Sequence, residues 1–173
     1  MASTEHHYTL DQPSFNKPIR LLVVVAPYYK DIAEQMISGA TAEIEDVGGT
    51  WELVEVPGAL EVPTAIAIAQ RLAKFDGYVA LGCVIRGETT HYETVSNDSS
   101  RALQLLSLQG ACIGNGILTV ENHAQAKVRA QADGQNKGGK AAAAALHLIA
   151  LTRRWGESTG RVGFLPTEEI GKA

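Results

Sequence analysis

Apolar residues follow two different spacings along the chain, and segments with the two spacings alternate. Continuous apolar runs occupy residues 19–26 (IRLLVVVA) and 77–85, and a further run at 111–118 is interrupted by two glycines. The first run is rich in β-branched residues, which is typical of a strand covered on both faces. Residues 50–56 (TWELVEV) form another segment that we expect to be a strand. The pattern therefore predicts four strands.

The segments between these strands carry the spacing of helices. Apolar residues recur at helical intervals from Ile32 to Val47, and Gly48-Gly49 is expected to end this helix. Asp31 and Glu34 have the spacing of an N-terminal cap and its reciprocal partner, so we expect the helix to begin near Asp31. Further helices are predicted at residues 63–74, 92–108, from 119–122 to about 132, and 140–155.

Strands that alternate with helices predict an α/β fold class, with a parallel sheet and helices on both of its faces. A chain of 173 residues has the size of one domain. We place that domain at residues 19–155, after a polar N-terminal arm at residues 1–18. Residues 156–173 are rich in glycine and charge, and we expect them to form a loosely attached tail.

Composition narrows the possible partners and the compartment. The formal net charge of −4 argues against nucleic acid or an anionic membrane as a main partner, so an anionic ligand must be held by local charge. The apolar runs are shorter than the roughly 18–20 residues of a membrane span, and residues 1–18 lack the pattern of a secretory signal. Cys83 and Cys112 lie in apolar runs, so we expect buried, reduced thiols. A cytoplasmic enzyme or binding protein fits these features.

In open parallel sheets, ligands bind beyond the carboxyl ends of the strands. Four loops follow the predicted strands, at residues 27–29, 57–61, 86–91 and 115–119, and the connection between the last two helices carries Arg129, Asn136 and Lys137. The loop within residues 82–95 (GCVIRGETTHYETV) is the most polar, because a buried strand ends there in a glycine and several groups that can bind an anion or move a proton.

Each of these polar residues also has a structural interpretation when it is taken alone. A histidine after a strand is more often a solvated loop residue than a catalyst, and Glu61 could simply complement a helix dipole. Together they are typical of a site for a phosphorylated molecule. Free N–H groups and hydroxyls after Gly87 could hold an anion with help from Arg129, and His91 could transfer protons. Tyr28 could stack on a flat ring.

Motifs for other chemistry do not occur in the sequence. There is no Gly-x-Gly-x-x-Gly after the first strand, no Gly-Lys-Ser/Thr loop and no Gly-x-Ser-x-Gly elbow. No cluster of His, Cys and Asp has the spacing of metal ligands. The sequence therefore favours proton-transfer chemistry on a phosphorylated small molecule without a metal, a cofactor or a covalent nucleophile.

Four motifs together resemble the 6,7-dimethyl-8-ribityllumazine synthase family over residues 19–155. They are VPGALEVP (56–63), GCVIRGETTHYETV (82–95), GILTVEN (116–122) and NKG (136–138). The resemblance implies a three-layer, flavodoxin-like fold with a four-stranded parallel sheet. It also implies a transferase of the penultimate step of riboflavin biosynthesis, which condenses 5-amino-6-(D-ribitylamino)uracil with L-3,4-dihydroxy-2-butanone 4-phosphate and releases phosphate and water.

The resemblance also implies roles for individual residues. His91 matches the general acid/base, and Tyr28 matches the aromatic residue that stacks on the pyrimidine. Asn115 and Arg129 match residues that a neighbouring subunit contributes to the pocket, so the implied partner is a second copy of the chain in a pentamer or a sixty-subunit shell. The remaining implied contacts are Ala59, Leu60 and Glu61 for the ribityl chain, Cys83, Val84 and Ile85 for the pyrimidine edge, Glu88 and Thr89 for the phosphate loop, and Lys137 near the phosphate.

The sequence departs from the family pattern at two positions. Many members have an aromatic residue where this chain has Asn115, which removes a packing contact from the pyrimidine. Glu88 places a carboxylate in the phosphate loop, so we expect its backbone N–H to face the ligand and its side chain to point away.

Two other functions remain as alternatives to the enzyme. They are a non-catalytic lumazine or flavin binder and a shell-forming structural protein. His91, Arg129 and Lys137 favour the enzyme, because a ring-binding protein needs no phosphate clamp.

Overall fold

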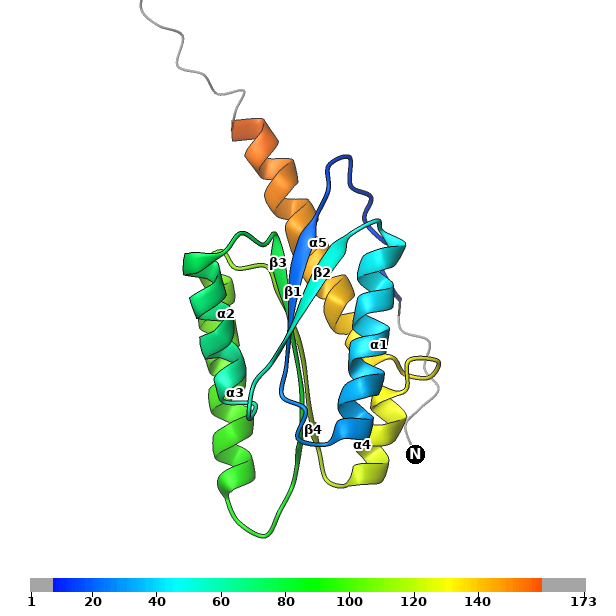
Figure 1. Ribbon diagram of the computed structural model, residues 1–173, viewed down its shortest axis with the longest axis vertical. Coiled ribbons are helices and arrows are strands. Elements are labelled where there is room, and N and C mark those ends of the chain that lie inside the picture. Colours follow the sequence, from blue (N-terminus) through cyan, green and yellow to red (C-terminus); the bar gives the residue numbers. More distant parts are fainter. Residues whose placement is uncertain (1–7, 160–173) are drawn as a thin grey trace, which may run out of the picture.

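The computed structural model describes residues 8–159, and this part of the chain folds into alternating strands and helices (Figure 1). Residues 8–18 form no regular secondary structure, and the predicted tail lies mostly outside the described residues. The elements in order are β1 (Arg20–Val25), α1 (Lys30–Asp46), β2 (Thr50–Glu55), α2 (Glu61–Leu72), β3 (Gly77–Ile85), α3 (His91–Leu108), β4 (Ile113–Val120), α4 (His123–Ala130) and α5 (Lys137–Thr159).

The four strands form one parallel sheet in the order β2-β1-β3-β4. Leu21 of β1 lies opposite Gly77 of β3, and Tyr78 of β3 lies opposite Ile113 of β4. All four strands therefore end at the same edge of the sheet. The predicted α/β fold class is confirmed, since each parallel connection passes through a helix.

Helices cover both faces of the sheet. In Figure 1, α2 and α3 lie on one face, and α1, α4 and α5 lie on the other. Each face has its own core, one containing Val23, Ile44 and Leu146 and the other containing Val24, Ile66 and Leu103. Because β1 and β3 are central, most of their residues are buried from both sides, as the apolar runs predict, and the exceptions are Arg20, Val84 and Ile85 at the strand ends.

The edge strands differ from this expectation. Every residue of β2 is exposed, and β4 alternates, with Asn115 and Thr119 exposed between buried neighbours. Thr119 was expected to begin a helix, and this prediction is wrong because Thr119 pairs with Val84 of β3. The helix begins at His123, where the Asn122 side chain accepts a hydrogen bond from Gln125 N at 2.9 Å. A side-chain cap thus sets this boundary.

The predicted cap at Asp31 is also wrong. Helix α1 begins at Lys30 after Tyr29, and its N-terminus has no side-chain cap hydrogen bond. The Asp31 carboxylate instead pairs with His123 Nε2 at 3.1 Å, which joins the starts of α1 and α4. An acidic residue in the first turn still complements the helix dipole, which explains why the sequence signal resembles a cap.

Helix α5 begins earlier and ends later than the predicted 140–155, because the NKG motif starts it. Asn136 has a φ of 46°, and its side-chain oxygen accepts a hydrogen bond from Gly139 N at 2.9 Å. Gly138 lies so close to α1 that an added Cβ would stand 2.1 Å from Met36 O. A Cβ on Gly114 of β4 would stand 1.8 Å from Ala141 O of the same helix. These glycines let α5 pack directly on its neighbours.

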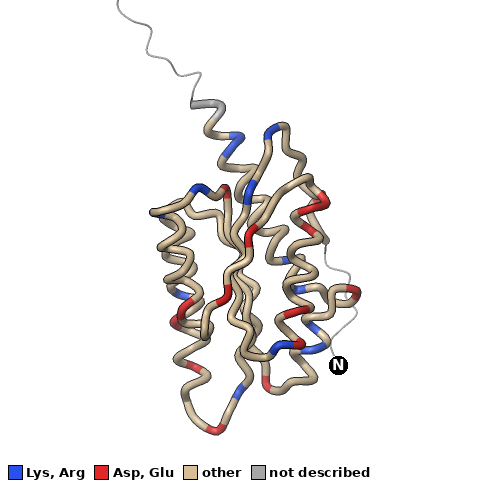
Figure 2. The backbone as a smooth tube through the Cα atoms, in the orientation of Figure 1, with Lys and Arg blue, Asp and Glu red and all other residues tan. Residues whose placement is uncertain are grey.

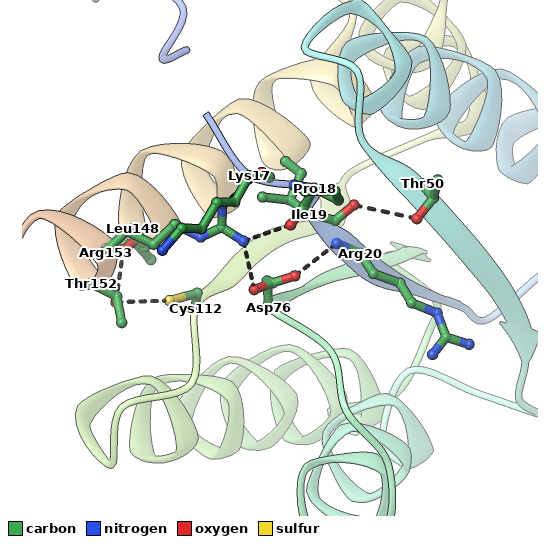
Figure 3. A network of polar contacts seen from close by, with 10 residues as sticks. All are labelled: Lys17, Pro18, Ile19, Arg20, Thr50, Asp76, Cys112, Leu148, Thr152 and Arg153. Carbon is green, nitrogen blue, oxygen red and sulfur yellow. Dashed lines mark hydrogen bonds and ion pairs between the residues drawn. The ribbon is translucent and has the colours of Figure 1, made fainter. Parts of the chain in front are cut away.

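Arg153 of α5 holds the end of the N-terminal arm (Figure 3). Its guanidinium donates hydrogen bonds to Lys17 O at 2.8 Å and Pro18 O at 2.7 Å, and it pairs with Asp76 at 3.1 Å. Asp76 in turn accepts a hydrogen bond from Arg20 N at 2.8 Å. The network therefore joins α5, the arm and the starts of β1 and β3 at the sheet edge where the strands begin.

Charged residues of both signs are interspersed along the described chain (Figure 2). No helix within residues 8–159 combines the length and the apolar composition that crossing a bilayer requires. Cys83 and Cys112 are both free and buried, which confirms the prediction for the two thiols.

Candidate active site

A cavity of about 420 Å³ lies where β1 and β3 end. The chain leaves β1 towards α1 on one face of the sheet and leaves β3 towards α3 on the other face, so the two connections diverge and open a crevice between them. The cavity is lined by Ala26, Tyr28, Tyr29, Pro57, Gly58, Ala59, Leu60, Glu61, Cys83, Val84, Ile85, His91 and Val95.

The structure divides the predicted site residues into two groups. One group lines the cavity and comprises Tyr28, Ala59, Leu60, Glu61, Cys83, Val84, Ile85 and His91. The other group does not line it. Glu88 and Thr89 are exposed in the loop before α3, and Asn115, Arg129 and Lys137 lie on β4, α4 and α5.

Two tyrosines form one wall of the cavity. The rings of Tyr28 and Tyr29 meet edge to face, with centroids 5.0 Å apart and an interplanar angle of 70°. Tyr28 is 75% exposed, so its ring is open to a ligand, whereas burial raises the pKa of Tyr29 above its ordinary value. Sequence reasoning placed Tyr29 in this loop but not at the site. The arrangement supplies an aromatic surface on which a planar ring can stack.

The loop after β2 forms the opposite wall and leads into α2. Glu61 is the first residue of α2, and its backbone N–H donates a hydrogen bond to Gly58 O at 3.1 Å. A Cβ on Gly58 would stand 2.9 Å from Glu61 Oε2, so this glycine makes room for the carboxylate. Pro57 and Gly58 were not assigned to the site, although both lie in the PGALE segment. The carboxylate can accept hydrogen bonds from ligand hydroxyls.

Cys83 lies at the base of the cavity as a neutral thiol. Burial is the main cause that raises its pKa to about 11, and the negative charge of Asp31 adds to the effect. A thiol with this pKa is protonated near neutral pH, and only the thiolate is an effective nucleophile. The cavity therefore has no activated cysteine, and Cys83 contributes shape and backbone contacts.

His91 is the first residue of α3, and its side chain is exposed at the mouth of the cavity. Its backbone N–H lies 3.4 Å from Thr89 Oγ1 and donates to that oxygen. Val95 also lines the cavity, because residues four apart share one face of a helix. Val95 was missed in the sequence, and helical spacing from His91 is the signal that could have found it.

A second cavity, of about 680 Å³, lies between α3 and β4. Asn115 lies there, and its side-chain oxygen accepts a hydrogen bond from Ile117 N at 3.0 Å. The charged residue of this cavity is Arg101, which pairs with Asp98 at 3.7 Å. The smaller cavity combines an aromatic surface, a carboxylate and an exposed imidazole. We therefore take it as the candidate active site, because chemistry decides more than volume.

The predicted phosphate cations are separated from His91 within one chain. Arg129 is half-buried near the end of α4, where its Nη1 donates a hydrogen bond to Gln125 O at 3.0 Å. Lys137 is half-buried at the start of α5. Helices α4 and α5 both lie on the face opposite α3. The His91 cavity therefore lacks these two cations in a single copy of the chain.

Comparisons with known proteins agree with one another. A family model described as 6,7-dimethyl-8-ribityllumazine synthase matches residues 18–153. A protein of that name from Jannaschia sp. (strain CCS1) is 55% identical over 161 residues, which cover 93% of this chain and 90% of the relative. Another from Bartonella henselae is 53% identical over 144 residues, covering 82% and 93%. The 6,7-dimethyl-8-ribityllumazine synthase 1 of Rhizobium meliloti is 49% identical over 146 residues, covering 81% and 95%.

Proposed function

The chain belongs to the 6,7-dimethyl-8-ribityllumazine synthase family of transferases in riboflavin biosynthesis, and from this membership we propose its reaction. It condenses 5-amino-6-(D-ribitylamino)uracil with L-3,4-dihydroxy-2-butanone 4-phosphate to 6,7-dimethyl-8-ribityllumazine and releases phosphate and water. This is the penultimate step of riboflavin biosynthesis, and we propose that it takes place in the cytoplasm.

The observation that carries the proposal is the joint presence of Tyr28, Glu61 and His91 around one cavity. Tyr28 offers a ring surface for the pyrimidine, and Glu61 offers a carboxylate for the hydroxyls of the ribityl chain. The imidazole of His91 can accept and return protons. These groups suit a reaction that needs alignment and proton transfer.

The chemistry explains why so few catalytic groups suffice. The amine attacks the ketone carbon, and loss of water gives an imine. A proton then leaves the neighbouring carbon as phosphate departs, which leaves an enol. The enol takes up a proton at its terminal carbon and loses its O–H proton to become a ketone. The second nitrogen attacks this new carbonyl carbon, and loss of a second water closes the ring. Correct alignment of two reactants can be worth roughly 7–11 kcal/mol. His91 would carry the protons, which contributes about 10²–10⁴-fold.

We propose that a neighbouring subunit completes the site. Asn115 and Arg129 would come from that neighbour, and Lys137 would lie near the phosphate, with the amides of residues 87–89 on the near side. The separation of these residues from His91 within one chain supports this arrangement. The assembly would be a homo-oligomer, either a pentamer or a sixty-subunit shell, with its sites between subunits.

The test is direct. Wild-type protein is incubated with both substrates, and the absorbance of the lumazine product is recorded over time. His91→Ala should lower kcat by about 10- to 1,000-fold while KM for each substrate changes little, since its role is proton transfer.

Two outcomes would contradict the proposal. Wild-type protein that binds lumazine but forms no product at saturating substrate would be a binder rather than an enzyme. A collapse of affinity in His91→Ala with turnover preserved would make His91 a binding residue.

A further inference from the structure

Arg86 opens the loop that leads from β3 to His91, and its backbone is fixed to the sheet. Its N–H donates a hydrogen bond to Val120 O, the last residue of β4, at 2.9 Å. Arg86 thus continues the pairing of β3 with β4 by one residue. Its Cα is anchored at the carboxyl edge of the sheet, immediately before the loop begins.

The side chain of Arg86 contacts residues at the start of α3 and at the end of β4. Its Nη1 pairs with Glu93, and its Nε donates a hydrogen bond to Glu121 Oε2 at 2.9 Å. The guanidinium carbon lies 4.1 Å from the centroid of the Tyr92 ring. Tyr92 and Glu93 directly follow His91 in the first turn of α3, and Glu121 directly follows β4. One guanidinium therefore joins the start of α3 to the ends of β3 and β4.

The loop that these contacts span has little other support. Residues 86–91 are all exposed. Thr90, at the N-cap of α3, makes no side-chain cap hydrogen bond. Exposed segments with few buried contacts open at a low free-energy cost. The contacts of Arg86 with Tyr92 and Glu93 thus limit where His91 can lie relative to the cavity.

Arg86 is poorly suited to bind phosphate itself. It faces two carboxylates, Glu93 and Glu121, so the local charge of the three groups is negative. The hydrogen bond from Arg86 is the main cause that lowers the pKa of Glu93, which keeps this carboxylate ionised at neutral pH. An incoming phosphate would meet this like charge and would have to displace existing contacts.

We propose that Arg86 is a positioning residue for the loop at residues 87–90 and for His91, and that it acts through Glu93, Tyr92 and Glu121 rather than by contact with substrate. The role in turnover rests on the proposed function, whereas the role in ordering the loop does not. Arg86 thereby has a role in the polar loop, although it takes part in no step of the proposed reaction.

The experiment compares Arg86→Ala, Glu93→Gln and the double variant with wild type in the full-length protein. Arg86→Ala should lower kcat about ten-fold through misplacement of His91, and KM for the phosphorylated substrate should rise in Arg86→Ala and Glu93→Gln alike, because the amides of residues 87–89 move with the loop. Glu93→Gln should act in the same direction, and the double variant should be no worse than Arg86→Ala, because both changes break one contact. Arg86→Lys should restore only part of the activity, since an ammonium group lacks the planar fork.

A matched control and a second readout separate this role from general destabilisation. Arg20 also lies at a strand end, pairs with Glu52 and sits 4.7 Å above the Phe75 ring, but at the opposite edge of the sheet. Arg20→Ala should keep wild-type kcat. Hydrogen exchange of residues 87–94 should be faster in Arg86→Ala and Glu93→Gln than in wild type or Arg20→Ala.

The outcomes are distinguishable. A higher KM for the phosphorylated substrate in Arg86→Ala, with a lower KM in Glu93→Gln, would make Arg86 a phosphate ligand and overturn the proposal. Wild-type kcat and exchange in both variants would also overturn it. If wild-type protein formed no lumazine, the proposed function would fail, yet hydrogen exchange would still decide whether Arg86 orders the loop.

Discussion

At the scale of single residues, Gly87 has open space around it that the described chain does not fill. A Cβ added there would meet no atom within 4 Å, and its φ lies outside the left-handed region that favours glycine. Within residues 8–159, neither close packing nor a left-handed backbone conformation requires a glycine at this position. A ligand that approaches the backbone closely would explain it, and the loop is the predicted phosphate site.

Gly87→Ala should therefore leave the free energy of unfolding within about 0.5 kcal/mol of wild type. KM for the phosphorylated substrate should rise several-fold, because the new methyl group would stand between the backbone N–H groups and the anion. Gly156→Ala, where a Cβ also meets no atom within 4 Å, is the control for KM, whereas its place in α5 means that alanine should raise the free energy of unfolding by up to about 1 kcal/mol. Unchanged KM in Gly87→Ala would place the phosphate elsewhere.

Sequence reasoning found the residues of the cavity that stand in short motifs. Tyr28, Glu61 and His91 each follow a strand, and parallel strands bring their following loops together. Tyr29 and Val95 were not predicted as residues of the cavity, because their place there depends on how a loop turns and how a helix is rotated. The pairing of Arg86 with Glu121 likewise needs the register of β3 with β4, which links residues 35 positions apart.

At the scale of elements, the contact between α5 and β4 depends on the absence of side-chain atoms. A Cβ on Gly114 would stand 1.8 Å from Ala141 O, which is a backbone atom in the middle of the core. Gly114→Ala should lower the free energy of unfolding by about 1–3 kcal/mol, because α5 must move outward to admit the methyl group. Chemical denaturation measures this difference.

Gly82→Ala is the matched control for that change. Gly82 lies in the neighbouring strand β3, where a Cβ would meet its nearest atom, Ala26 Cβ, at 3.6 Å, an ordinary contact. Its free energy of unfolding should differ little from that of wild type. Equal stability of Gly114→Ala and Gly82→Ala would mean that α5 can shift at no cost, which contradicts close packing.

The number and order of the elements followed from the alternation of apolar spacings, and their ends did not. The end of β4 and the start of α4 were misplaced, because a helix was expected to start at residues 119–122, whereas the pairing of Thr119 with Val84 extends the strand. The start of α5 was placed late, because Asn136 caps it from a left-handed conformation. Boundaries depend on a single hydrogen bond, whereas interiors depend on many repeated contacts.

In the molecule as a whole, the polar network around Arg153 and the candidate active site lie at opposite edges of the sheet. Arg153 joins the arm, α5 and the starts of two strands at one edge, and the His91 cavity lies at the other. Among the described residues that line this cavity, Glu61 is the one with a formal charge. A phosphorylated substrate in this cavity would need cations from elsewhere, and under the proposed arrangement a second copy of the chain supplies them.

The last prediction tests that shared site with two variants of lowered activity. Under the proposed arrangement, His91 and Arg129 of one pocket belong to different chains in a ring of like interfaces. His91→Ala and Arg129→Ala proteins are unfolded together and reassembled at equal ratio. A pocket then regains both groups when an Arg129→Ala chain supplies His91 and a His91→Ala chain supplies Arg129, which random placement produces in roughly a quarter of pockets. Activity should rise towards about that fraction of wild type, well above either parent.

A pocket formed within one chain predicts a different result for the same mixture. If both residues served a pocket within one chain, every pocket would still lack one group, and mixing would restore nothing. Reassembled wild-type protein sets the scale for recovery, and mass spectrometry of the intact assemblies confirms that the chains have exchanged. Exchanged assemblies no more active than the average of the two parents would exclude a site between subunits, because a pocket that takes His91 and Arg129 from different chains must regain both groups at some of the mixed interfaces.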